Sequence, residues 1–168
     1  SWNVLMTAYM NLGYDIEAIG CYKAMISEGV ILSQASFLCG LKACANIGAI
    51  DEGREIHSEI CRRRFEGDVQ IGTSLVDMYA KWGSLLDAFL VFNTLPHHDV
   101  VSCGSMITGY IQHENWFSAC KIYELMHQKD ITPDNISFAC ILKACSGLES
   151  VHLGELVHDD VIRCGFGK

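Results

Sequence analysis

The chain has 168 residues, half of them hydrophobic, which is enough to bury a substantial core. Its formal net charge of −8 at pH 7 argues against a protein that holds nucleic acid through a broad basic surface. Only two prolines are present and helix-forming residues dominate, which favours an all-α fold.

Apolar residues recur at helical spacing along the whole chain, in pairs of short segments. The first members of the pairs are predicted helices near residues 1–12, 35–46, 70–81, 102–112 and 136–146. The second members are predicted helices near residues 15–27, 50–63, 84–94, 115–128 and 151–164. Because one pair alone leaves its apolar face bare, we expect stacked pairs, that is, an all-α, α-solenoid superhelix of five helix–turn–helix repeats with about ten helices.

The third pair carries the clearest local signals. Gly83 follows its first helix, where glycine takes the left-handed conformation without penalty. Lys81 lies in the last turn, where a cation complements the helix dipole. Ser84, with Asp87 three residues later, predicts a start resembling a capping box for the second helix.

Three columns of residues recur with the same steps of 35, 35, 31 and 35. The first column ends the first helices: Gly13, Gly48, Gly83, Glu114 and Glu149. The second column is small and lets paired helices approach closely: Ala18, Gly53, Ala88, Ala119 and Gly154. The third column is aromatic or His and is expected to pack: Tyr22, His57, Phe92, Tyr123 and His158. Where Glu replaces Gly, we expect a less cleanly ended helix and a cost of up to about 1 kcal/mol.

Nine cysteines occur, with no Cys-x-x-Cys pair. Five of them lie in apolar helical patterns, where a free cysteine acts as a small hydrophobe: Cys39, Cys44, Cys103, Cys140 and Cys145. We therefore expect reduced, structural cysteines and a reducing intracellular compartment. No apolar run approaches the roughly 20 residues that span a bilayer, so we expect no membrane segment.

A longer period overlies the helix pairs. The sequence Leu-Lys-Ala-Cys at 41–44 returns at 142–145, which is 101 residues later. The chain is therefore built from three kinds of repeat, in the order first, second, third, first, second.

These segments, with Ser-Trp-Asn at 1–3 and Leu-Val-Asp-Met-Tyr-Ala-Lys at 75–81, resemble the pentatricopeptide repeat family. The stepping resembles its P-L-S subclass, found mainly in land-plant organellar RNA-processing proteins. By that resemblance the repeats are P at 1–33 (lacking two N-terminal residues), L at 34–68, S at 69–99, P at 100–134 and L at 135–168 (one residue short). We expect part of a longer mitochondrial or plastid protein, whose targeting segment lies outside this sequence.

The resemblance implies sequence-specific binding of single-stranded RNA, about one base per repeat, read by the fifth and last residues of each repeat. Those base-reading residues are Asn3 with Ser33, Thr73 with Asp99, and Gly104 with Asp134. In the family the first pair favours cytosine, or pyrimidines generally, and the second favours guanine. Gly104 has no side chain that could donate a hydrogen bond to a base or accept one from it. In the L repeats, apolar side chains hold the fifth position and cannot hydrogen-bond a base.

Family members also stack each base between the second residues of adjacent repeats. Val101 and Ile136 suit such stacking, whereas Ala35 and Gln70 depart from the usual aliphatic choice. Lys81 matches a position that contacts phosphate. The implied partners are single-stranded RNA and a deaminase-bearing or other editing protein, in an RNA editing, modification or maturation factor, with no cofactor and no membrane.

Other functions find less support in the residues. His57 and Glu59 match half of a zinc deaminase signature, but no Pro-Cys-x-x-Cys completes the site, so we expect His57 to pack. The adjacent His97 and His98 are expected in a solvated loop rather than on a metal. Paired catalytic carboxylates and phosphate loops are lacking, so we expect no enzyme.

Two alternatives stay open. The three arginines at 62–64 complement the dipole of the helix they end, and the alternative is a phosphate contact. The alternative function is a protein-interaction scaffold similar to tetratricopeptide repeats, although such arrays keep a steady period of 34 residues.

Overall fold

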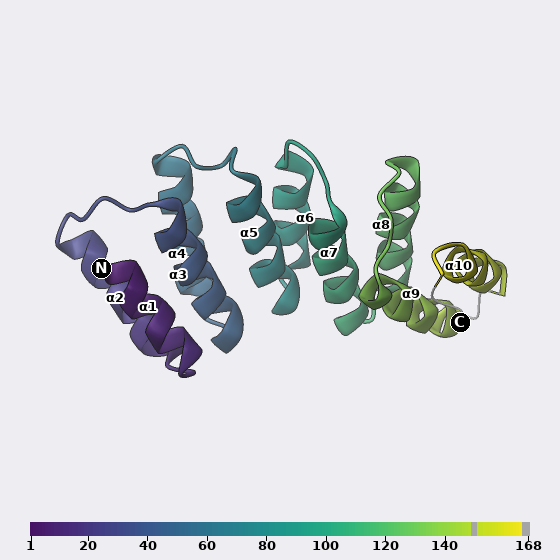
Figure 1. Ribbon diagram of the computed structural model, residues 1–168, viewed down its shortest axis with the longest axis horizontal. Coiled ribbons are helices and arrows are strands. Elements are labelled where there is room, and N and C mark those ends of the chain that lie inside the picture. Colours follow the sequence, from purple (N-terminus) through teal and green to yellow (C-terminus); the bar gives the residue numbers. More distant parts are fainter. Residues whose placement is uncertain (149–150, 166–168) are drawn as a thin grey trace. The chain divides into compact units, whose positions relative to one another are not determined.

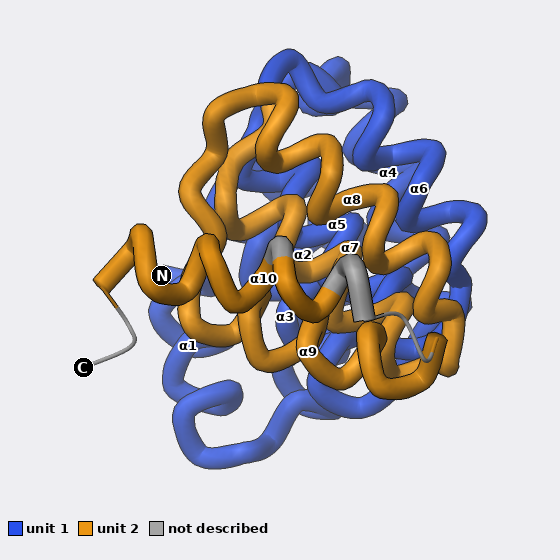
Figure 2. Tube along the Cα trace, turned by 90° about the vertical axis from the view of Figure 1, so that its right-hand side faces the viewer, with its two compact units in different colours: residues 1–97 blue, residues 98–168 orange. Residues whose placement is uncertain are grey.

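The computed structural model describes residues 1–148 and 151–165, except the side chains of 151–153 and 156. Glu149, one of the predicted helix ends, lies outside the described residues. The chain forms two compact units, Ser1–His97 and His98–Lys168 (Figure 2), and each is described by itself. No helix in the described residues is both long enough and apolar enough to cross a bilayer.

The described residues contain ten α-helices and no strand. Unit 1 holds the pairs α1 (Trp2–Asn11) and α2 (Asp15–Ser27), α3 (Gln34–Ile47) and α4 (Ile50–Arg62), and α5 (Val69–Lys81) and α6 (Leu85–Thr94). Unit 2 holds the pairs α7 (Val100–Gln112) and α8 (Trp116–Gln128), and α9 (Asn135–Gly147) and α10 (Val151–Arg163). Every helix lies within two residues of its predicted bounds at both ends, so the assignment from apolar spacing is confirmed.

The helices of unit 1 form two layers. The first helices make one layer, because α3 packs against both α1 and α5 (Figure 1). Each second helix packs on the first helix of its own pair, and α2 and α4 also pack on the first helix of the next pair. In unit 2, α9 likewise packs against α7, α8 and α10. The predicted α-solenoid of helix pairs is confirmed.

The small residues of the second column do allow close helix packing in four of the five pairs. Three are fully buried: Ala18, Ala88 and Ala119. A Cβ added at Gly53 would lie 2.2 Å from the sulfur of Met78, so a larger residue there would require the Met78 side chain to shift. The expectation is wrong for Gly154, where an added Cβ would meet nothing within 4 Å.

The cysteines are free thiols, all nine of them. Four are buried: Cys44, Cys103, Cys120 and Cys145. Burial raises the pKa of Cys44 to about 12 and that of Cys103 to about 11, because a thiolate is poorly solvated there. These two cysteines are therefore neutral core side chains, as expected for structural thiols.

Left-handed glycines follow the first helices of unit 1: Gly13, Gly48 and Gly83. In unit 2, Glu114 takes the same conformation, with a φ of 57°. The backbone N–H of Asn115 donates to the carbonyl of Tyr110 at 2.8 Å. An equivalent hydrogen bond closes α5 in unit 1. The expectation of a less cleanly ended helix is wrong in geometry. The backbone of Glu114 is instead strained, because a residue with a Cβ rarely adopts the left-handed conformation.

The third pair is short because its second helix, α6, has 10 residues where α2, α4 and α8 have 13, and because α6 ends without a left-handed residue. Such residues follow α2, α4 and α8: Gly29, Arg64 and Asp130. After α6 the chain passes directly into extended Leu95, with a φ of −61° and a ψ of 134°. Leu95 is buried, and a Cβ at Gly72 of α5 would lie 2.4 Å from its Cδ2. The step of 31 residues therefore comes from a shorter second helix together with this direct turn.

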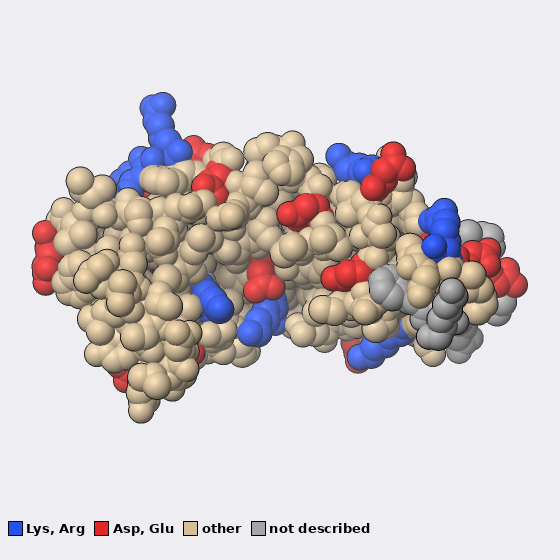
Figure 3. All heavy atoms as spheres, in the orientation of Figure 1, with Lys and Arg blue, Asp and Glu red and all other residues tan. Residues whose placement is uncertain are grey.

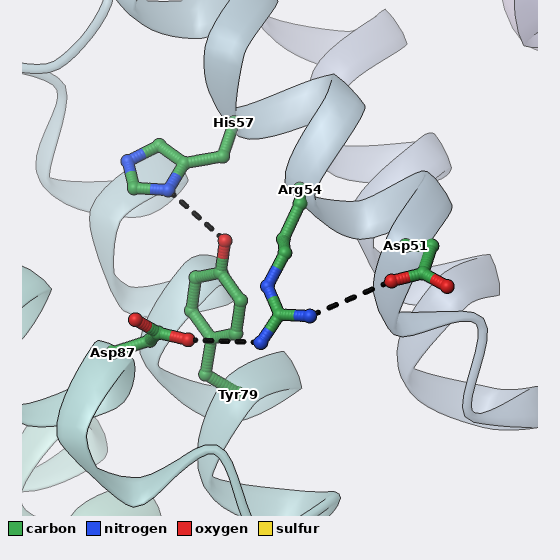
Figure 4. Close-up of polar contacts among 5 residues, drawn as sticks. All are labelled: Asp51, Arg54, His57, Tyr79 and Asp87. Atoms are coloured by element: carbon green, nitrogen blue, oxygen red, sulfur yellow. Dashed lines mark hydrogen bonds and ion pairs between the residues drawn. The ribbon is translucent and has the colours of Figure 1, made fainter.

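The capping box predicted at Ser84 and Asp87 does not form. Ser84 is the N-cap of α6, but its side chain makes no capping hydrogen bond. Asn115, the N-cap of α8, has a similar backbone conformation, with a ψ of 65° against 56° for Ser84, and its longer side chain does accept from the N–H of Ser118. Asp87 instead pairs with Arg54 of α4, whose Nη2 lies 3.2 Å from its Oδ2 (Figure 4).

His57 packs between α4 and α5, as its place in the third column predicts. Its Nδ1 lies 3.1 Å from the hydroxyl of Tyr79 (Figure 4). Burial lowers the pKa of His57 and raises that of Tyr79 to about 12. The same expectation is wrong for His158, which is exposed.

We expect Glu114→Gly to raise the free energy of unfolding by up to about 1 kcal/mol, because glycine relieves the left-handed strain. Gly83→Ala, at the equivalent turn, should lower it by a similar amount. Urea unfolding followed by circular dichroism measures both changes. Destabilisation by Glu114→Gly would contradict the assigned strain.

We expect stability to fall as the pH drops below about 6.5, the ordinary pKa of histidine. The folded state disfavours the charged form of His57, so the unfolded chain binds protons first in this window. His57→Gln, which keeps a polar partner for Tyr79 but does not titrate, should reduce this loss. Urea midpoints at pH 7.5 and 5.5 test it, and an undiminished loss in the variant would refute the assignment.

Candidate nucleic-acid interface

The last residue of each of the first four predicted repeats is the N-cap of the next first helix. Each of these side chains accepts a hydrogen bond from the backbone N–H three residues later: Ser33, Asp68, Asp99 and Asp134. Three of the four are predicted base-reading residues. Their capping role escaped the sequence analysis, although a serine three residues further on is a recognisable capping-box signal in three cases: Ser36, Ser102 and Ser137.

Asn3 of α1 lies against the N-cap of α3. Its Nδ2 donates to Ser33 Oγ at 3.2 Å. Ser36 Oγ donates to Asn3 Oδ1 at 2.9 Å. Ser36 is fully buried, whereas Asn3 is half-buried and Ser33 is exposed. The structure thus brings the predicted pair Asn3 and Ser33 together and adds a buried serine that sequence reasoning missed.

Gly104 and Asp134 hold the equivalent positions in unit 2. Asp134 Oδ1 accepts from the backbone N–H of Ser137 at 2.8 Å and from its hydroxyl at 2.7 Å. A Cβ added at Gly104 would lie 3.9 Å from Ser137 Oγ, with no other atom within 4 Å. Gly104 therefore leaves open the space that the Asn3 side chain fills in unit 1.

Thr73 and Asp99 belong to different units, so each is described separately. Within the described residues, Thr73 Oγ1 is buried and has no hydrogen-bond partner. Asp99 caps α7, where it accepts from the N–H of Ser102 at 2.8 Å. An unpaired buried hydroxyl costs about 1–3 kcal/mol, and a base can relieve this cost only where the hydroxyl is uncovered. The pairing of Thr73 with Asp99 stays a prediction.

A second polar contact links the junctions of unit 1. Gln34 Nε2 donates to Asp68 Oδ2 at 2.8 Å and to Gln70 Oε1 at 3.1 Å. Gln34 therefore joins the N-terminal ends of α3 and α5. Gln70 departs from the aliphatic choice at its position, and the structure shows its amide oxygen engaged in this contact.

The predicted stacking and phosphate residues are solvent-exposed. Val101 is 58% exposed on α7 and Ile136 is 62% exposed on α9. Lys81 is exposed in the last turn of α5. These apolar and cationic side chains are accessible to a ligand, which their predicted roles require.

Basic side chains are few on the face that Figure 3 shows. On the described residues shown in Figure 3, Lys and Arg form separate spots interrupted by Asp and Glu rather than a continuous band. Two of the three arginines at the end of α4, Arg62 and Arg63, pair with the buried carboxylate of Glu59. Among the described residues, no group of three or more His, Cys, Asp or Glu side chains is arranged to hold a metal ion.

Family models match much of the chain. The PPR repeat family model matches residues 98–147, and the PPR repeat model matches residues 1–30 and 73–100. Together these segments cover more than half of the sequence.

Curated relatives match nearly the whole chain. A pentatricopeptide repeat-containing protein of Arabidopsis thaliana is 36% identical over 99% of this chain and 23% of its own length. A chloroplastic member from the same plant is 37% identical over 98% of this chain and 31% of its own length. A mitochondrial member is 32% identical over 100% of this chain and 16% of its own length. The chain therefore spans a third or less of the length of these relatives.

Solved structures share the fold at low sequence identity. Nuclear proteinaceous RNase P 2 of Arabidopsis thaliana matches with a TM-score of 0.78 and 17% identity, over 95% of this chain and 37% of that one. The pentatricopeptide repeat protein PPR10, solved with an 18-nt psaJ RNA element, matches with a TM-score of 0.61 and 16% identity, over 95% of this chain and 29% of that one. With its stacked helix pairs, its matching family models and its relatives, the chain belongs to the pentatricopeptide repeat family.

Proposed function

We propose that this chain binds single-stranded RNA in a sequence-dependent way, with about one base facing each repeat. The contact between Asn3 and Ser33 carries the proposal, because it places an amide and a hydroxyl side by side at a repeat junction. Such groups can hydrogen-bond the edge of an unstacked base. The RNA complex of PPR10, whose fold this chain shares, supports the same assignment.

The proposal extends to the larger protein. The repeats follow the P-L-S order, and the whole protein works in mitochondria or plastids, where relatives are named as chloroplastic or mitochondrial. Its task is RNA editing or another maturation step. This chain supplies recognition rather than catalysis, and a deaminase-bearing or other editing protein supplies the chemistry.

Recognition in this proposal depends on base edges and stacking more than on phosphates. The formal net charge is −8, and Lys81 is the one predicted phosphate contact. Because few cations displace counterions, affinity should be modest and should fall only weakly with added salt.

Selection from a pool of randomised short RNAs by the full chain tests the proposal. Enrichment of a short motif is expected, with sharper preference at the P- and S-repeat bases than at the L-repeat bases. No enrichment, together with recovery of peptide partners, would instead support the scaffold function similar to tetratricopeptide repeats.

We expect Thr73→Asn to shift the preference at one base from purine toward pyrimidine, because an amide replaces a hydroxyl at the fifth position of the S repeat. The same RNA selection measures the shift. An unchanged profile in a variant that still binds would refute the assigned register.

We expect Gly104→Asn to sharpen base preference at one nucleotide, because it places an amide beside Ser137 where Cβ space is open. Gly20→Asn is the matched control, since Gly20 is an exposed glycine of the second-helix layer with equally open space. The control should leave the RNA profile unchanged. Equal profiles for both variants would show that residue 104 does not face a base.

A further inference from the structure

We propose that Thr7 contacts the ribose of a bound nucleotide and accepts a hydrogen bond from its 2′-hydroxyl, so that the chain distinguishes RNA from DNA. The inference rests on the proposed function and deepens it, because residues that read a base leave the sugar unread. The 2′-hydroxyl is the group that separates the two nucleic acids, since deoxyribose carries only hydrogen at that carbon.

Thr7 lies on α1 between the positions predicted to meet the two ends of a nucleotide. Asn3, the predicted base-reading residue, precedes it by four residues, and Asn11, the equivalent of the predicted phosphate contact Lys81, follows it by four. Residues four apart share one face of a helix and lie about 6 Å apart along its axis. Because the sugar joins the base to the phosphate, a nucleotide that spans these positions passes its ribose over Thr7.

Thr7 faces the same neighbouring helix as Asn3. Its Oγ1 lies 3.6 Å from Cys39 Sγ of α3, one helical turn beyond the contacts that Asn3 makes with the start of that helix. Thr7 is nevertheless exposed. It therefore lies at an accessible edge between α1 and α3, beside the amide that is predicted to read the base.

The hydrogen bonds of Thr7 make its oxygen an acceptor. The hydroxyl donates to the backbone carbonyl of Asn3 at 2.8 Å, and a carbonyl can only accept, so the direction of this bond is fixed. In the longer contact with Cys39 the thiol is then the donor. Within the described part of the chain these contacts use one of the two lone pairs of the oxygen, and the other remains for a ligand. A 2′-hydroxyl can donate to it, whereas the C2′ hydrogens of DNA cannot.

The second P repeat carries the same arrangement. Thr108, which follows Thr7 by 101 residues, is half-buried on α7, and its Oγ1 lies 3.9 Å from Cys140 Sγ of α9. The hydroxyl therefore recurs whether the base-reading position holds Asn3 or Gly104. Such independence of the base-reading side chain is expected of a contact to the sugar, which is the same in every nucleotide of RNA.

The test is binding of the full chain to an RNA enriched from the randomised pool, with and without one 2′-fluoro group at the nucleotide facing the first repeat. That nucleotide is the one whose base preference Asn3→Ala removes. Fluorine keeps the sugar pucker of RNA but cannot donate, so affinity should fall about five-fold, the change that one hydrogen bond is worth. Thr7→Val keeps the shape of the side chain without the hydroxyl. This variant should bind the unmodified RNA about five-fold more weakly and lose nothing further from the fluorine.

Two more variants separate the ribose contact from a general effect on the chain. Thr7→Ser keeps the hydroxyl and should keep the sensitivity to fluorine. Thr94→Val is the matched control, because Thr94 is an exposed threonine of α6 whose hydroxyl also donates to a backbone carbonyl, that of Val91 at 2.7 Å. It should bind both RNAs as the unaltered chain does.

The outcomes separate this inference from the proposed function. An unaltered chain that binds both RNAs equally, or a Thr7→Val variant that still loses five-fold from the fluorine, would overturn the ribose contact and leave sequence-dependent RNA binding intact. An unaltered chain that enriches no RNA would overturn both.

Discussion

The structure depends on one constraint at every repeat junction: a single short polar side chain must begin the next helix. The N-terminal turn of a helix leaves backbone N–H groups without partners, and an N-cap side chain satisfies one of them for about 1 kcal/mol. Here that residue also lies beside the helix of the preceding repeat, as Ser33 does beside Asn3. In the proposed function the same side-chain atoms cap the helix and contact the base, so the residue at a junction affects both helix stability and ligand binding.

The second-helix layer has a different feature, a buried carboxylate in α4 and another in α10. Glu59 and Asp160 are 6% and 8% exposed, and each pairs with an arginine three residues later. Asp160 also accepts from the hydroxyl of Tyr123 at 2.7 Å, which ties α10 to α8. A buried charge is tolerated only where such partners compensate its desolvation. The Tyr123 contact thus links two second helices of unit 2, whereas Glu59 pairs with the arginines at the end of its own helix.

Much of the fold was predictable from the sequence, because apolar spacing and recurring glycines report local requirements that a helix pair meets by itself. The contacts at the repeat junctions were harder to predict from the sequence. Asn3 and Ser36 are distant in sequence, and their hydrogen bond follows from stacking rather than from either helix. Ser84 resembled a capping residue, but its side chain makes no capping hydrogen bond, which its residue type and spacing do not reveal. The resemblance identified Asn3 with Ser33, yet the burial of Thr73 Oγ1 has no sequence signal.

The short turn after α6 constrains how such repeats can be recombined. Leu95 turns inward directly after the helix, and a Cβ at position 72 would lie 2.4 Å from its Cδ2, so a larger residue at 72 would require the Leu95 side chain to shift. Glycine at 72 and leucine at 95 therefore pack as a coupled pair, although most of the repeat lies between them. A 31-residue repeat made by deleting four residues from a 35-residue one needs a residue at position 72 that accommodates the inward side chain at position 95. Modular exchange of these repeats must respect that coupling.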